Sequence, residues 1–180
     1  MNNFVFVAIL AVFVYFMLLK STFEIKAGIF IYQEPKKVYE SISSMDTIQR
    51  FHPFAVSTKL VRKETSPEGV VTEFHNIEEH IPVMWNWTFP LLFEVKMEFT
   101  KPDEVLTFSY SIWYGTVIGQ VTWTIEPREG HKGPGVYLSS TSRITCPWPT
   151  SSFTEQRATE SQNDILQRIA NVVEYMSKVD

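Results

Sequence analysis

The sequence predicts an α+β fold in which an antiparallel sheet with one covered face packs against a long C-terminal helix. One apolar helix precedes this domain at the N-terminus. Three observations support this prediction: an uninterrupted apolar run over residues 4–19, alternating apolar and polar residues between residues 94 and 125, and a last segment with helical spacing. The chain has 180 residues, of which 44% are hydrophobic and 20% charged, so it suits one folded domain with a short appendage.

The apolar run at the N-terminus is the first element. It contains no charge, glycine or proline and is followed by Lys20. As a helix rising about 1.5 Å per residue it covers roughly 24 Å, slightly less than a hydrocarbon core of about 30 Å. Because Lys20 can snorkel, we expect residues 1–20 to form an uncleaved membrane anchor. Two alternatives stay open: a cleaved secretory signal, although no basic residue precedes the run and no small-residue cleavage site follows it, and a buried core helix.

The positive charges indicate how such an anchor is oriented. No Lys or Arg precedes the run, whereas Lys20, Lys26, Lys36 and Lys37 follow it closely, so the positive-inside rule places the body in the cytosol. The single Cys146 permits no internal disulfide, which is typical of a reducing compartment. We therefore expect a single-pass membrane protein with a cytosolic body, for instance in the endoplasmic reticulum, or a secreted protein if the run is a cleaved signal.

The body after the anchor begins with a strand and two short helices. Residues 21–32 are rich in β-branched and aromatic side chains, which predicts a first strand. Pro35 suits the first turn of a helix and is followed by an apolar stripe at helical spacing. Residues 46–51 predict a second short helix, which Pro53 ends.

Strands fill the chain from residue 54 to residue 145. Residues 94–100, 104–112 and 117–125 alternate apolar and polar side chains, which is the pattern of an antiparallel sheet with one buried face. After these strands, a capping-box sequence at Ser152 predicts the start of a long helix. Its apolar residues repeat at helical spacing and are expected to cover the sheet, with Gln162 on the opposite, polar side.

This order of elements and several short matches carry a resemblance. The matches are Val38 and Tyr39 in the first short helix, the segment 46–53 with its final aromatic residue and proline, and Gly119 with Trp123 in a late strand. The chain resembles the START-like (SRPBCC) superfamily, in its polyketide cyclase-like or lipid-binding branch. The resemblance implies a helix-grip fold, with a curved antiparallel sheet of about seven strands wrapped around the C-terminal helix, and a START-like ligand-binding domain over residues 21–180.

The same resemblance implies an apolar cavity between the sheet and the helix. Aromatic and aliphatic side chains on the inward rows would form its wall, although the same side chains would also fill a dense core. The candidate ligand-binding residues are Trp85, Trp87, Val95, Met97, Phe99, Leu106, Phe108, Tyr110, Trp123, Ile165, Ile169 and Val173.

The segment 81–93 is the most unusual stretch of the body. It is almost entirely apolar or aromatic and is bracketed by Pro82 and Pro90. Two interpretations stay open. The segment is either a buried strand with a proline bend, or it lines the mouth of the cavity and touches a bilayer through Trp85 and Trp87, since Trp favours the membrane interface.

Several kinds of chemistry find little support in the sequence. A net charge of −4 argues against a nucleic-acid partner, which needs Lys and Arg to displace counterions. His75 and His80 lie on opposite faces of a strand and cannot share a metal ion, and His52 and His131 stand beside turn residues, as exposed loop histidines do. We assign no catalytic residue, no metal ligand and no cofactor.

The expected function is therefore the binding of a lipid or another hydrophobic small molecule by a membrane-anchored protein, with lipid transfer as one use of it. Two other functions stay open. One is an enzyme of the polyketide cyclase or hydrolase type on the same fold, and the other is a protein-interaction module with a vestigial cavity.

Overall fold

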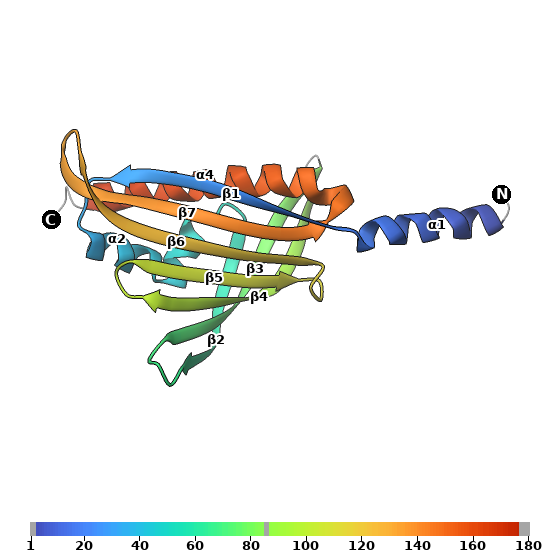
Figure 1. Ribbon diagram of the computed structural model, residues 1–180, viewed down its shortest axis with the longest axis horizontal. Helices are drawn as coiled ribbons and strands as arrows, with labels where there is room; N and C mark the ends of the chain where they lie inside the picture. The colour runs from blue at the N-terminus through green and yellow to red at the C-terminus, as the bar shows by residue number, and fades with distance from the viewer. Residues whose placement is uncertain (1–2, 85–86, 177–180) are drawn as a thin grey trace.

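A seven-stranded antiparallel sheet and a long C-terminal helix form the frame of the protein (Figure 1). The computed structural model describes residues 3–84 and 87–176. In chain order the elements are α1 (Asn3–Leu18), β1 (Lys20–Ile31), α2 (Pro35–Ile42), α3 (Met45–Phe51), β2 (Ala55–Thr65), β3 (Val71–Met84), β4 (Trp87–Lys101), β5 (Val105–Ile112), β6 (Val117–Gly130), β7 (Gly133–Pro147), a 3-10 turn (Trp148–Thr150) and α4 (Ser151–Met176).

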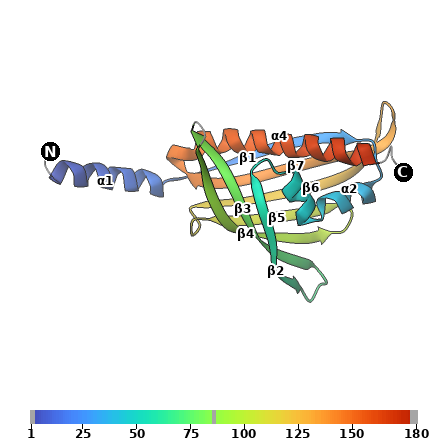
Figure 2. The same cartoon turned by 180° about the vertical axis from the view of Figure 1, so that it is seen from behind.

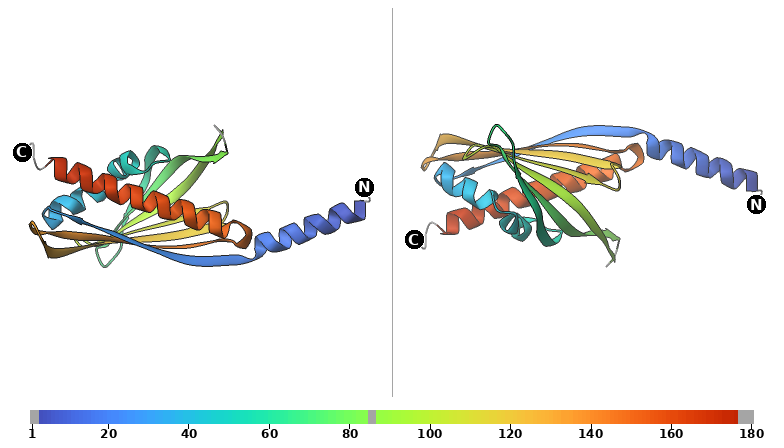
Figure 3. Two further views of the ribbon diagram at one scale, coloured as in Figure 1. Left: turned by 90° about the horizontal axis from the view of Figure 1, so that it is seen from above. Right: turned by 90° about the horizontal axis from the view of Figure 1, so that it is seen from below.

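The strands lie side by side in the order β1-β7-β6-β5-β4-β3-β2, so that β1 and β2 are the two edges. β6 and β7 pair up to Gly130 and Gly133, so that only residues 131 and 132 connect them. Register shifts in the β2–β3 pair mark bulges, which increase the local twist of a sheet. The predicted antiparallel helix-grip architecture is confirmed, with α4 lying along the inner face of the sheet (Figure 3).

α2 and α3 carry the chain from one edge strand to the other. Pro35 stands in the first turn of α2, and Val38, Tyr39 and Ile42 are buried, as the apolar stripe predicts. Both helices pack beside the C-terminal half of α4, opposite the end at which α1 leaves the sheet (Figure 2). α2 therefore occupies that end of the interior.

The inner face of α4 includes one residue that the sequence pattern places wrongly. Ile165, Leu166, Ile169 and Val173 are buried as expected for an amphipathic helix. Gln162 is also buried, with 8% of its surface exposed, and does not lie on the polar side. Its position follows from helical spacing, because residues three and four apart share one face of a helix.

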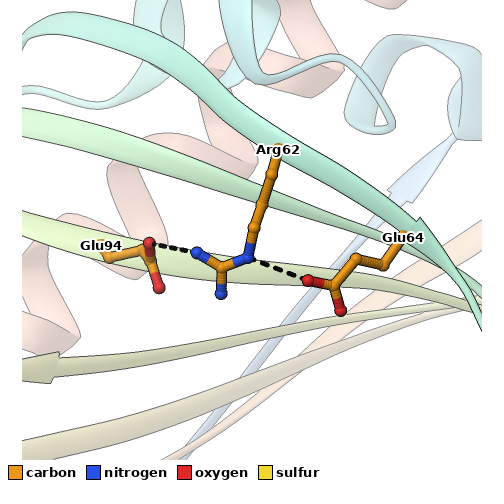
Figure 4. A network of polar contacts seen from close by, with 3 residues as sticks. All are labelled: Arg62, Glu64 and Glu94. Carbon is orange, nitrogen blue, oxygen red and sulfur yellow. Dashed lines mark hydrogen bonds and ion pairs between the residues drawn. The ribbon is translucent and has the colours of Figure 1, made fainter.

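The outer face of the sheet is polar, as the alternation predicts. On this face Arg62 forms ion pairs with Glu64 (Nε to Oε1, 3.0 Å) and Glu94 (Nη1 to Oε2, 3.1 Å), which links β2 to β4 (Figure 4). The guanidinium also lies 3.5 Å from the centre of the Phe74 ring. Exposed pairs of this kind contribute little free energy, so the burial of the inner face stabilises the sheet.

The predicted membrane localisation is wrong. α1 contains 16 residues and ends at Leu18, because the chain enters β1 at Lys20 and the Leu19 carbonyl accepts a hydrogen bond from the Trp148 N–H at 2.8 Å. Within residues 3–84 and 87–176, no helix is long and apolar enough to cross a membrane. The prediction of a transmembrane helix is therefore wrong, and so is the prediction of a single-pass protein with a cytosolic body. The domain division at residue 20 stays a prediction.

Candidate functional site: a cavity between the sheet and α4

A cavity of about 490 Å³ lies between the inner face of the sheet and the N-terminal half of α4. Its walls come from α3, the inward residues of β3 to β7, and α4 from Phe153 to Leu166. Most of the lining side chains are aliphatic or aromatic. The hollow therefore occupies the end of the interior that α2 leaves unfilled.

The residues predicted from the sequence divide into two main groups. Five of them line the cavity: Val95, Phe108, Tyr110, Trp123 and Ile165. Five others pack in the core cluster or against it, away from the cavity wall: Met97, Phe99, Leu106, Ile169 and Val173. Residues of both groups belong to this cluster or pack against it, together with Val38 and Ile42 of α2. Ligand contact by the first group stays a prediction.

Within the segment 81–93, residues 81–84 end β3 and residues 87–93 begin β4, and most of the side chains described there are not buried. Trp87 is 80% exposed and does not line the cavity, and Leu92 is 72% exposed. Trp85 lies outside the described residues. The inward residues of the same segment do line the cavity: Ile81, Phe89, Leu91 and Phe93. Only this half of the cavity-mouth interpretation is supported.

Tyr110 owes its position to a glycine. The residue opposite it on β6 is Gly119, and a Cβ atom at that position would overlap the Tyr110 ring. Gly119 thus lets the ring lie flat against β6 within the cavity wall. Burial raises the pKa of the Tyr110 hydroxyl, so the hydroxyl stays protonated and can donate a hydrogen bond.

His52 and Glu79 form a polar pair in the cavity wall that the sequence does not predict. The His52 Nε2 atom lies 3.4 Å from Glu79 Oε1, and the two side chains are 21% and 13% exposed. The backbone N–H of Phe54 donates to His52 Nδ1 at 3.3 Å. Because Nδ1 accepts, the neutral imidazole carries its proton on Nε2 and can donate it toward Glu79.

Burial changes the charge state of this pair. It lowers the pKa of His52 to about 4, with the positive charge of Arg168 adding to the effect. It also raises the pKa of Glu79 to about 7. The separation is short enough for an ion pair, but between these two pKa values both side chains are neutral. The contact is then a hydrogen bond from imidazole to a protonated carboxyl group.

His52 was expected in an exposed loop, and that expectation is wrong. The sequence does contain a signal for Glu79, because Ile77, Glu79 and Ile81 alternate along β3 and all three line the cavity. No sequence signal relates His52 to Glu79, since α3 brings the histidine to β3 only in the folded chain.

The other histidines lie apart from one another. His75 is paired with Glu73 at 3.1 Å, and His80 is paired with Glu78 at 3.3 Å. Among the described residues, no group of three or more His, Cys, Asp or Glu side chains lies close enough to hold a metal ion.

A second polar group in the cavity wall joins α4 to β7. The Gln162 Nε2 atom donates to the Ser140 carbonyl oxygen at 3.0 Å and lies 2.6 Å from the Ser140 hydroxyl. Ser142 follows on the same face of β7, is 5% exposed and lines the cavity. The cavity is thus mostly apolar, and its polar residues include the His52–Glu79 pair and Gln162.

The sequence matches no protein-family model and no curated protein at a significant level. Solved structures are similar to it in fold. The di-domain aromatase/cyclase StfQ from the steffimycin biosynthetic pathway has a TM-score of 0.68 and 9% identity over 87% of this chain and 52% of that one. The chain therefore spans about half the length of this di-domain protein.

Two single-domain structures are similar along almost their whole length. The ZhuI aromatase/cyclase from Streptomyces sp. R1128 has a TM-score of 0.67 and 8% identity, over 86% of this chain and 94% of that one. Norcoclaurine synthase from Thalictrum flavum has a TM-score of 0.63 and 9% identity, over 89% and 99%. At these identities the likeness shows the fold alone, which is the helix-grip fold that the resemblance implies.

Proposed function

We propose that this protein binds a hydrophobic small molecule in the cavity between the sheet and α4. The observation that carries the proposal is the cavity itself, which has a volume of about 490 Å³ and a mostly apolar wall with a few polar residues. Ligand sites in proteins have volumes of roughly 300 to 1,000 Å³ and this kind of lining. Lipids are one class of such ligands, and lipid transfer stays a prediction. The volume argues against the interaction module with a vestigial cavity.

Binding of a neutral fluorescent probe tests this proposal. We expect N-phenylnaphthylamine to bind the full chain saturably, at one probe per chain, and naphthol to displace it. The physical reason is the transfer of apolar surface from water into the cavity. Fluorescence titration measures the affinity, and mass spectrometry of solvent extracts identifies any molecule that copurifies. Probe binding that does not saturate, together with extracts that hold no small molecule, would contradict the proposal.

Acid–base catalysis on the bound molecule is a second candidate function. One observation favours it, namely that the Glu79 carboxyl group faces an apolar cavity with a pKa raised to about 7 by burial. A carboxyl group that changes charge near neutral pH can both give and take a proton during turnover. His52 holds this group from one side. The solved aromatase/cyclases and norcoclaurine synthase share the fold and, by their names, are enzymes.

The pH dependence of stability tests this second candidate. Because the folded chain holds a proton on Glu79 that the unfolded chain has lost, Glu79 makes the free energy of unfolding fall as pH rises from about 4.5 to about 7. Glu79→Gln should therefore gain stability relative to the wild type across this window, by on the order of 2 kcal/mol at about pH 8. Urea unfolding at a series of pH values measures the difference.

His52→Gln is the matched control for this experiment. The lowered pKa of His52 makes the free energy of unfolding of the wild type rise with pH between about 4 and 6.5. The variant should lack this rise, which is opposite in sign to the effect of Glu79. If the Glu79→Gln and wild-type stabilities run parallel with pH, Glu79 titrates in its ordinary range and the catalytic candidate fails.

A further inference from the structure

Gln162 carries a buried polar atom whose hydrogen-bonding capacity is unused. Its side chain lines the cavity and is largely buried. The amide nitrogen is bound to Ser140, but within the described part of the chain the Oε1 atom accepts no hydrogen bond. Leaving a buried acceptor unpaired costs free energy, so such an atom in a ligand-sized hollow calls for a partner.

The orientation of this amide follows from its surroundings. The carbonyl oxygen of Ser140 can only accept, so the group that faces it at 3.0 Å must be the Gln162 nitrogen. The nitrogen also reaches the Ser140 hydroxyl at 2.6 Å, which holds the amide from the same side. The oxygen is therefore the atom that remains for a group inside the cavity.

The wall around this position favours a neutral partner over a charged one. Ser140, Ser142 and Ser161 are the uncharged polar residues of the wall nearest to Gln162 along α4 and β7. Arg157, five residues earlier on α4, is already paired with Glu160 at 3.1 Å. An acceptor oxygen attracts a hydrogen-bond donor and repels a carboxylate or a phosphate, and burying an unpaired ion in an apolar cavity is costly.

We propose that Gln162 Oε1 accepts a hydrogen bond from a hydroxyl or N–H group of the cavity ligand, which is therefore a neutral apolar molecule with a donor group. This inference rests on the proposed binding function and specifies the class of ligand. The ligand places its donor at Gln162 and its apolar part against the aromatic and aliphatic wall, where Phe108, Trp123 and Ile165 lie.

A pair of matched probes tests the inference. Naphthol has an O–H donor, and methoxynaphthalene has the same rings with the donor removed. Calorimetric titration of the full chain gives the ratio of their affinities in the wild type and in Gln162→Met, which keeps the side-chain length but removes the acceptor. We expect the ratio to shift toward methoxynaphthalene by roughly 3- to 10-fold in the variant, the usual net effect of one hydrogen bond.

Gln167→Met is the matched control, because it makes the same substitution on the exposed side of α4, outside the cavity wall; its ratio should equal that of the wild type. If circular dichroism shows that Gln162→Met is unfolded, Gln162→Asn is used in its place. Its shorter side chain moves the acceptor oxygen away from the ligand and should produce the same shift in the ratio of affinities. Binding of both probes with a ratio that neither Gln162 variant changes would overturn this inference and leave the binding function intact. Binding of neither probe to the wild type would overturn both.

Discussion

Ser142→Leu is expected to weaken the binding of N-phenylnaphthylamine by about tenfold or more, with little loss of stability. Ser142 is 5% exposed and lines the cavity from β7. A leucine there places its branched side chain in the volume that the ligand would occupy. Larger side chains in a filled core cost about 1 to 3 kcal/mol, but here the added atoms enter a hollow and gain contacts. Fluorescence titration and urea unfolding measure the two effects.

Thr141→Leu is the matched control for this variant. Thr141 is the neighbour of Ser142 on β7, and its side chain points to the other face of the sheet. The same leucine on that face should leave probe affinity unchanged. If both variants bind the probe as the wild type does, the probe binds outside the cavity, for example on the exposed apolar surface of α1, and the proposed site is wrong.

Truncation of two isoleucines on α4 is expected to have unequal costs. Ile169 is fully buried in the core cluster with Val38 and Ile42, whereas Ile165 lines the cavity. Ile169→Ala should lower the free energy of unfolding by about 4 kcal/mol, because it loses buried contacts and leaves a new void. Ile165→Ala should cost about 2 kcal/mol, since its side chain already borders a hollow and has fewer contacts to lose.

Urea or thermal unfolding of both variants measures these costs, and probe titration adds a second difference. Ile165→Ala should change probe affinity, and Ile169→Ala should leave it unchanged wherever the variant is folded. Equal costs at the two positions would mean that the interior is packed alike along α4, which contradicts a cavity confined to its N-terminal half.

The His52–Glu79 pair shows how far the sequence leads toward the site. The alternation of β3 places Glu79 on the inward row between Ile77 and Ile81, so a buried carboxyl group could be predicted from strand periodicity. Its partner could not, because His52 ends α3 and reaches β3 only through the docking of two elements that are separate in sequence. The shifted pKa values depend on that docking as well, since burial causes both of them.

The apolar N-terminal run is a case in which the sequence predicts a feature that the structure does not have. Composition alone predicts a membrane anchor over residues 4–19, because hydropathy counts apolar residues without regard to where a helix ends. In the structure the helix ends at Leu18, where the strand begins that pairs with β7. The length of the helix is decided by sheet pairing, which hydropathy does not describe.

The amino-acid sequence by itself determined the order of the elements, the inward and outward faces of the strands, and the apolar stripe of α4. These features depend on residues close together in the chain, through the repeats of two and about 3.6 residues. The tertiary structure alone decided which inward residues enclose a cavity and which fill a core. Val95 and Met97 face inward on the same strand, yet only Val95 borders the hollow. The difference arises because α2 occupies one end of the space beneath α4, whereas α3 forms part of the wall of the hollow at the other end.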